Sequence, residues 1–145
     1  MIALLQRVTE ARVAIDGAVH AAIGAGLLAL IGVRPADGEH ETHRLLERML
    51  RYRIFADGDE RMNRSVADVG GALLLVPQFT LAADTAKGLR PGFSHAAPPD
   101  QARRLFDDLV ALASSRHSPV ASGIFGADMQ VSLTNDGPVT IWLET

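Results

Sequence analysis

Cysteine is absent from this chain of 145 residues. Its absence excludes a disulfide framework, a thiolate zinc site and a cysteine nucleophile. Long apolar runs are missing as well, since none reaches the roughly 20 residues that a membrane-spanning helix requires. The first residues, MIALLQRV, lack the basic stretch, apolar segment and small-residue cleavage site of a secretion signal. These absences predict a cytoplasmic protein with no membrane attachment.

An excess of positive charge is also lacking, because 14 Lys and Arg residues are set against 17 Asp and Glu residues, for a net charge of −3. Proteins that grip nucleic acid mainly through its phosphates are usually basic, so any such contact must be local. One candidate group lies near a predicted helix and is interleaved with acids, which favours a solvated helix face: Arg44, Arg48, Arg51 and Arg53. The better candidate lies in a loop with few acids: Lys87, Arg90 and His95.

The common catalytic motifs are missing too. The five histidines form no HxH or HExxH pair. His40 and His43 lie three residues apart at a predicted helix start, but without a further ligand nearby they are interpreted as a surface pair. Phosphate-binding motifs of the GxxxxGK[ST] and GxGxxG types do not occur, and neither does a GxSxG nucleophile elbow. The sequence therefore predicts no metal and no cofactor, and it gives little support to a classical serine or metal hydrolase.

The length and the apolar content of 48% predict one domain over residues 1–145. Apolar patterns predict helices over residues 39–51 and from Pro98-Pro99 through Ala113. They predict strands over residues 2–8, 11–15, 18–23, 27–33, 52–55, 72–76, 120–125, 129–133 and 139–143. Asp16-Gly17 predicts a hairpin with a primed turn. Many strands and two helices indicate an α+β fold built on a strongly curved, barrel-like β-sheet.

Two polar segments border predicted strands. The first, PQFTLA over residues 77–82, follows a buried strand whose ladder Pro77 ends, because proline has no N–H to donate. Gln78 and Thr80 are compatible with a plain strand end, since a threonine hydroxyl without an adjacent base is a weak nucleophile. The second, NDGPVT over residues 135–140, has the composition of a hairpin turn between the last two strands. A Gly-Pro bond can also be cis at modest cost, so both interpretations stay open.

The chain resembles the D-aminoacyl-tRNA deacylase family over essentially its full length. The resemblance is carried by the signatures (S/P)QFTL at residues 77–81 and NxGPxT at residues 135–140, together with MIALLQRV, RPGFSH and ADMQVSL. The chain departs from the family pattern at Pro77, where many members have Ser. It also has Gly92 and His95 where Ser and Lys are frequent.

This resemblance implies a homodimer in which a Gly-cisPro dipeptide, Gly137-Pro138, enters the active site of the partner subunit. Backbone carbonyls of the dipeptide would hold the α-amino group of the substrate so that an L side chain collides with the wall. Arg7 would support this loop, although without the resemblance it is interpreted as a surface charge. The implied substrates are D-aminoacyl-tRNA and glycine mischarged on tRNA(Ala), with L-aminoacyl-tRNA rejected.

The resemblance also implies that the terminal adenosine of tRNA binds near Gln78, with Phe125 and Met129 lining the adenine pocket. Without the resemblance, the last two residues are interpreted as core. The N–H groups of Phe79 and Thr80 would form an oxyanion hole. Water would attack with help from the 2′-hydroxyl of the tRNA, with a nucleophilic or base role for Thr80 as the alternative.

Two rival functions remain open. The nearer one is a deacylase tuned to glycine on tRNA rather than to D-amino acids, which the same Gly-Pro arrangement would admit. The more distant one is a non-catalytic nucleic-acid-binding module on the same fold. Such a module is expected to be basic and salt-sensitive, so the net negative charge counts against it.

Overall fold

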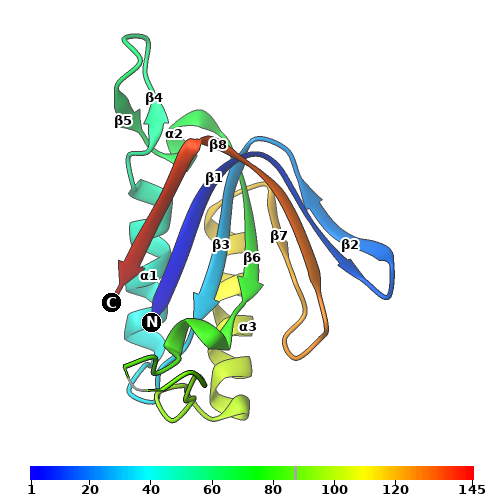
Figure 1. Cartoon of the computed structure of the whole chain (residues 1–145). Coiled ribbons are helices and arrows are strands. Elements are labelled where there is room, and N and C mark those ends of the chain that lie inside the picture. Colours follow the sequence, from blue (N-terminus) through cyan, green and yellow to red (C-terminus); the bar gives the residue numbers. More distant parts are fainter. Residues whose placement is uncertain (87) are drawn as a thin grey trace.

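Two long strands organise the molecule. In the computed structural model, which describes residues 1–86 and 88–145, β1 spans Ile2–Ile15 and β8 spans Gln130–Glu144. They pair antiparallel along nearly their whole length (Figure 1). The other edge of β1 pairs with β3 (Gly26–Gly32) through its first half and with β2 (Ala18–Ile23) through its second half. One bent strand therefore belongs to both halves of a curled sheet.

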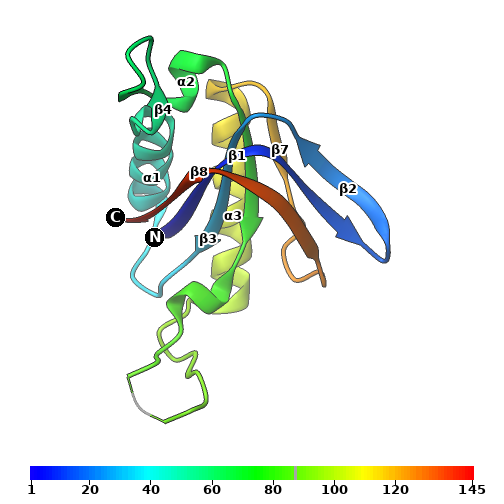
Figure 2. The same ribbon diagram turned by 45° about the horizontal axis from the view of Figure 1, so that its top comes forward.

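The sheet continues beyond β3 with two parallel neighbours. β6 (Ala72–Pro77) pairs with β3, and β7 (Val120–Ser122) pairs with β6. The helices α1 (Glu39–Arg51) and α3 (Pro99–Arg116) cover one face of this part (Figures 1 and 2). Shorter elements complete the chain: β4 (Phe55–Ala56), β5 (Met62–Arg64), the one-turn helix α2 (Val66–Val69) and the 3₁₀ turn η1 (Phe79–Ala82).

Both faces of β3 and β6 are buried, each against a different layer. Leu27, Leu73 and Leu75 belong to the core formed with α1 and α3. The alternate residues Leu28 and Leu74 belong to a second core, formed where the far halves of β1, β2 and β8 curl over the opposite face. A strand buried on both faces is apolar throughout, which is why these two strands read as continuous apolar runs.

The predicted α+β class with a strongly curved sheet is confirmed. α1 has the predicted bounds, and α3 begins within the predicted Pro98-Pro99 pair. Asp16 and Gly17 have φ values of 50° and 79°, as a primed turn requires. The helix α2 was not predicted, because a single turn capped by Ser65 carries no apolar periodicity.

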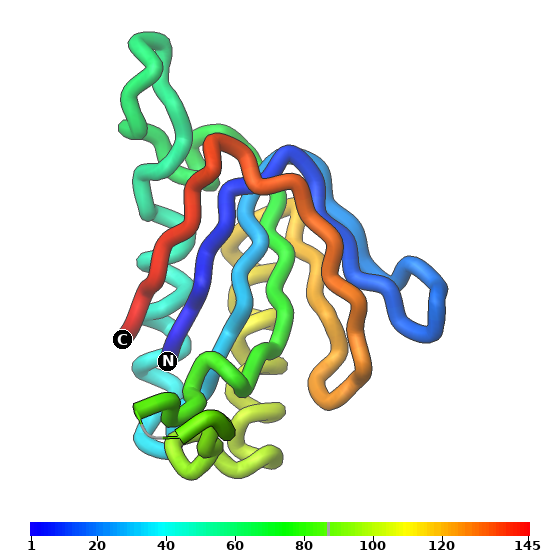
Figure 3. Tube along the Cα trace, viewed as in Figure 1, coloured from blue at the N-terminus to red at the C-terminus, as the bar shows by residue number. Residues whose placement is uncertain are grey.

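The predicted hairpin between the last two strands is wrong, since β8 is one continuous strand through residues 130–144. The trace bends sharply at this place (Figure 3). Asn, Asp, Gly and Pro are residues typical of turns, but β1 pairs with β8 on both sides of them and keeps the strand in register. Two other strands are shorter than predicted. β4 begins only at Phe55, and β7 ends at Ser122, so Phe125 lies in the connection between β7 and β8.

Candidate functional site

The motif NDGPVT forms a bulge in the β1–β8 ladder. Gln6 pairs with Thr140 and Val8 pairs with Asn135, so the single residue Arg7 is opposed by residues 136–139. The extra residues on β8 leave the ladder at the bend of that strand, which lies at the upper end of the large sheet in Figure 1. A bulge of this kind re-aims the backbone groups it carries.

Arg7 anchors the bulge to the body of the protein. Its Nε donates to the backbone oxygen of Asp136 at 3.2 Å and lies 3.0 Å from the carboxylate oxygen Oδ2 of the same residue. Its Nη1 donates to the carbonyl oxygen of Ile54 at 2.6 Å. The Arg7 side chain is only 14% exposed, whereas that of Asp136 is 49% exposed, so the bond to Ile54 is the one made with the least competition from water. The guanidinium thus ties the bulge to the segment that follows α1.

Asn135 closes the bulge at its base. Its Nδ2 donates to the carbonyl oxygen of Arg7 at 2.9 Å on one strand and to that of Val139 at 2.9 Å across the bulge. One amide group therefore satisfies two acceptors that the interrupted ladder leaves without partners. The sequence motif contained Asn135, but no role was predicted for it. The first position of NxGPxT is the signal from which such a role could have been inferred.

The tip of the bulge is the dipeptide Gly137-Pro138, whose peptide bond is cis. Gly137 has φ of +121°, a region that L residues rarely adopt. A Cβ atom at this position would lie 2.7 Å from Nη2 of Arg7 and 2.9 Å from Cγ2 of Val139. Glycine is therefore required here both by backbone conformation and by the close approach of Arg7.

The motif PQFTL lies at the opposite end of the sheet. Pro77 is the last residue of β6, and the next hydrogen bond to the carbonyl oxygen of Ile31 comes from the N–H of Gln78 at 2.7 Å. The chain then enters η1, whose N-terminus leaves the first backbone N–H groups, those of Phe79 and Thr80, without intrahelical partners. The amide Nε2 of Gln78 donates to Oγ1 of Thr80. Two backbone donors are thus presented beside an oriented hydroxyl.

A pocket of about 490 Å³ opens beside Gln78 and Phe79. Its other walls come from the first turn of α3 and from residues 125–129, which include Phe125 and Met129. The thioether sulfur of Met129 would lie 2.7 Å from a Cβ at Gly123, so this side chain is closely packed into the wall. Four of the predicted site residues therefore line one pocket, although residue types alone favoured a core location for two of them.

Phe79, in the wall of this pocket, packs against a second aromatic ring. The rings of Phe79 and Phe93 have centroids 5.0 Å apart at an interplanar angle of 55°, a favourable tilted arrangement. Phe93 belongs to a loop that folds back on itself through two backbone bonds between Asp84 and Gly92. Of the basic loop group predicted to contact nucleic acid, Arg90 and His95 are exposed in this loop, whereas Lys87 lies outside the described residues.

Within one chain, the bulge and the pocket are far apart. Gln78 lies beside the first residues of β1, because a Cβ at Gly32 would contact both the Gln78 carbonyl oxygen and Ile2. Arg7, at the bulge, is five residues further along the same strand, which corresponds to roughly 17 Å. Gly137 and Pro138 are therefore not brought together with Gln78, Phe79 and Thr80 in a single subunit.

The other candidate features are surface features. Arg51 pairs with Glu47 at 3.0 Å, and Arg48 donates to the backbone oxygen of Glu144, so two members of the helix-borne basic group are engaged within the chain. No group of three His, Asp or Glu side chains that could hold a metal ion occurs among residues 1–86 and 88–145. In the same part of the chain, no helix is both long enough and apolar enough to cross a membrane.

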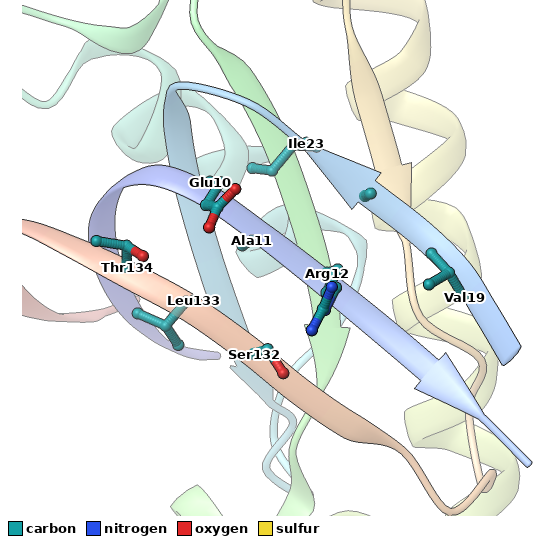
Figure 4. A pocket seen from close by; sticks show the side chains of 9 residues that line it. Glu10, Ala11, Arg12, Val19, Ile23, Ser132, Leu133 and Thr134 are labelled. Carbon is teal, nitrogen blue, oxygen red and sulfur yellow. The ribbon is translucent and has the colours of Figure 1, made fainter. Parts of the chain in front are cut away.

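A second hollow of about 370 Å³ lies on the curled half of the sheet (Figure 4). It is mixed in polarity, with the following residues in its walls: Glu10, Ala11, Arg12, Val19, Ala22, Ile23, Ser132, Leu133 and Thr134. None of the predicted site residues is among them.

Two of the carboxyl groups with a shifted pKa illustrate why such shifts do not mark the site. The pKa of Glu41 is lowered to about 2, first by a hydrogen bond with His40 and then by the N–H of Gly38 at the start of α1. The pKa of Asp57 is lowered by hydrogen bonds from the side chain of Asn63 and from nearby N–H groups in the β4–β5 turn. Both groups hold local turns and caps, and neither lies in the pocket.

Comparison with known proteins gives concordant matches over the whole chain. The family model described as D-Tyr-tRNA(Tyr) deacylase matches residues 4–144. Curated relatives named D-aminoacyl-tRNA deacylase, from Thioalkalivibrio sulfidiphilus and Methylococcus capsulatus, are 64% and 61% identical to this chain. Each alignment covers 99% of the chain, and 97% and 94% of the respective relative.

Two solved structures share the fold. One, described as c-Myc DNA Unwinding Element Binding Protein, superposes with a TM-score of 0.96 at 37% identity and covers 100% of this chain and 99% of its own. The other, described as a probable eukaryotic D-amino acid tRNA deacylase, has a TM-score of 0.84 at 18% identity and covers 99% of this chain and 98% of its own. At 18% identity, the likeness concerns the fold alone.

Proposed function

The chain belongs to the D-Tyr-tRNA(Tyr) deacylase family and is an ester hydrolase of the D-aminoacyl-tRNA deacylase type, and we propose that it clears two kinds of mischarged tRNA. These are D-aminoacyl-tRNA and glycine attached to tRNA(Ala), whereas L-aminoacyl-tRNA is left intact. The reaction takes place in the cytoplasm, where aminoacylated tRNA is used. The observation that carries this proposal is that both family motifs form built structures, a braced bulge and a pocket beside the N–H groups at the start of η1.

The active unit is a homodimer. The bulge and the pocket lie roughly 17 Å apart along β1 of one subunit, so one chain cannot bring them to a common substrate. A two-fold axis that places the bulge of each subunit over the pocket of the other forms two complete sites in each dimer. The exposed position of Asp136, Gly137 and Pro138 is consistent with such an insertion.

Chirality is read by the backbone of the inserted bulge. Carbonyl groups of Gly137 and Pro138 accept hydrogen bonds from the α-ammonium group of the substrate and fix its orientation. With that group fixed, the side chain of a D residue points away from the bulge, whereas that of an L residue points into it and collides. Glycine passes because it has no side chain. The clamps from Arg7 and Asn135 hold the bulge rigid, which such a steric criterion requires.

The pocket holds the terminal adenosine. Its volume of about 490 Å³ is in the range of small-ligand sites, and Phe125, Met129 and Phe79 provide apolar surface for a planar base. Gln78 is placed at the wall next to η1, so an adenosine in the pocket brings its esterified ribose to the N–H groups of Phe79 and Thr80. Binding of the nucleoside thus positions the ester.

Hydrolysis proceeds by attack of water on the ester carbonyl. The N–H groups of Phe79 and Thr80 stabilise the oxyanion that develops, each by about 3 kcal/mol if well placed. The adjacent 2′-hydroxyl of the terminal ribose assists the water, and proximity makes up for the lack of a strong protein base. The Thr80 hydroxyl accepts a hydrogen bond from Gln78, which orients its oxygen without raising its basicity.

The alternative is a nucleic-acid-binding module without catalysis. The 37% identical structure described as c-Myc DNA Unwinding Element Binding Protein favours it, because its description names DNA binding. The net charge of −3 counts against it, since non-specific DNA binding relies on basic surface. We prefer the enzyme, because the braced bulge has no evident use in binding a nucleic-acid backbone.

The test compares D-tyrosyl, L-tyrosyl and glycyl esters of tRNA, each also prepared with a terminal 2′-deoxyadenosine. We expect hydrolysis of the D-tyrosyl and glycyl esters, none of the L-tyrosyl ester, and loss of hydrolysis on removal of the 2′-hydroxyl. If tRNA or duplex DNA is bound and no ester is cleaved, the binding module is the correct function.

Mixing two inactive variants tests the cross-subunit site. Gly137→Val removes a functional bulge, and Gln78→Ala damages the pocket. A mixed dimer contains one site in which an intact bulge meets an intact pocket, so random mixing should restore roughly a quarter of the wild-type activity. No restoration in dimers shown to have exchanged subunits would overturn the cross-subunit arrangement.

A further inference from the structure

Arg103, on the second turn of α3, lies over the ring of Phe125. Its guanidinium carbon Cζ is 4.9 Å from the ring centroid, within the range of a cation–π interaction. The same guanidinium is also close to the next residue, because a Cβ at Gly126 would lie 3.5 Å from Nη2 of Arg103. The planar group is therefore held in place although the residue as a whole is exposed.

The Phe125 ring separates two hollows. One is the pocket of about 490 Å³ beside Gln78, which Phe125 and Gly126 line. The other is a groove of about 340 Å³ between α3 and the chain that follows β7, lined by both Arg103 and Phe125. A nucleoside in the pocket thus has Arg103 on the far side of the aromatic wall.

The Arg103 guanidinium has no ion-pair partner among the residues that the structure describes, whereas its neighbour Arg104 lies 3.7 Å from Asp108. Two carboxylates line the same two hollows. Asp107 lines the groove and Asp128 lines the pocket, but neither is within ion-pair distance of Arg103. An arginine held by an aromatic ring, with its N–H groups unengaged by a carboxylate, is suited to bind a phosphate.

We propose that Arg103 binds the phosphodiester on the 5′ side of the terminal nucleoside while it stacks on Phe125. The inference rests on the proposed function, because that function places the nucleoside in the pocket. With the ester end of the ribose at η1, the 5′ oxygen is directed toward the wall that Phe125 forms, and Arg103 lies against that residue. Arg103 thereby distinguishes an adenosine that is joined to a nucleic-acid chain from a free nucleoside, because only the former has the phosphate that Arg103 contacts.

Binding of adenosine and of adenosine 5′-monophosphate, measured by calorimetry or NMR titration, tests the contact without any chemistry. The wild-type protein should bind the monophosphate about tenfold more tightly, the ratio expected for one charge-assisted contact. Arg103→Ala should bind the two ligands equally. Arg104→Ala, an exposed arginine at the adjacent position, is the matched control and should keep the wild-type ratio. Asp107→Asn removes a negative charge from the groove and should increase the ratio.

Hydrolysis of the D-tyrosyl esters of the same two ligands separates the contact from a merely structural role. Arg103→Ala should raise KM about tenfold for the monophosphate ester, change kcat little, and leave the nucleoside ester within twofold of wild type. Arg103→Lys should recover part of the loss, since the charge is kept while the planar fork is lost.

Two results would overturn the inference. Equal losses on both esters would mean that Arg103 only holds Phe125 in place, and an unchanged binding ratio in Arg103→Ala would mean that no phosphate contact exists. Failure of the proposed function is a separate result. If the wild-type protein cleaves no ester but Arg103 still controls the preference for the monophosphate, the phosphate contact stands and the deacylase chemistry falls.

Discussion

Replacing Gly137 with alanine tests the braced bulge most directly. The added Cβ would lie 2.7 Å from Nη2 of Arg7 and 2.9 Å from Cγ2 of Val139, both too close for an unstrained contact. The backbone φ of +121° also disfavours any L residue, by about 1–3 kcal/mol. Relief requires a shift of either the bulge or Arg7, and a shift of Arg7 weakens its 2.6 Å bond to the carbonyl oxygen of Ile54.

Together, strain and one weakened charged hydrogen bond predict a destabilisation of about 2–4 kcal/mol, confined to the bulge and its contacts. If the bulge shifts by about 1 Å, the carbonyls proposed to hold the substrate move with it, and kcat/KM should fall by about 100-fold. The core is not touched, so the variant should remain folded and keep the oligomeric state of the wild type.

The assay is steady-state hydrolysis of D-tyrosyl-tRNA, with unfolding and size-exclusion measurements on the same preparations. Gly24→Ala is the control, because a Cβ at Gly24 meets nothing within 4 Å and its backbone needs no positive φ. Retention of activity within threefold of wild type in Gly137→Ala would refute the reasoning, since it would mean that the position of the bulge does not govern the reaction.

Three further changes test other parts of the structure. Asn135→Asp replaces a donor by a carboxylate that faces two carbonyl oxygens. The free energy of unfolding, measured with urea, should fall by about 2–4 kcal/mol, and activity should be lost in parallel. Asn135→Ala should have a smaller effect. Thr80→Ala should lower kcat less than tenfold if only the N–H of residue 80 acts, whereas complete loss would give its hydroxyl a chemical role. Glu41→Gln should lower the Tm at pH 7 but not near pH 2. The pKa of Glu41 in the folded protein is about 2, below its ordinary value of 4.5, so the stabilisation is full above pH 4.5 and is lost as the pH falls toward 2. An equal Tm difference at both pH values would contradict this assignment.

The fold could be predicted where one local pattern decides the structure. The apolar stripe of α1 and the Asp16-Gly17 turn gave correct elements, because a period of 3.6 residues and a positive φ at two adjacent positions each have one common outcome. The bulge in β8 could not be predicted in this way. Its residues are those of a hairpin turn, and only the pairing of β1 with both flanks of the motif, closed by Asn135, keeps β8 one continuous strand.

The candidate site, too, could be predicted only where the signal is local. The motifs around Gln78 and Gly137 were found from sequence, because they are short and contiguous. The pocket was not, since its walls come from β6, α3 and the β7–β8 connection, which no local pattern brings together. The cation–π contact of Arg103 with Phe125 was likewise invisible, because it joins a helix face to a loop through tertiary packing.

The proposed function explains why the site tolerates Pro77 where many family members have Ser. Pro77 lines the pocket through its ring, while the hydrogen bond that continues the ladder comes from Gln78. The groups proposed to act on the ester are backbone N–H groups one and two residues further on, and the groups proposed to read chirality are backbone carbonyls of Gly137 and Pro138. Because these groups belong to the backbone, a change of side chain at position 77 leaves them in place as long as η1 keeps its position. A site built from backbone groups tolerates this substitution, whereas a site that relied on a serine hydroxyl at position 77 would not.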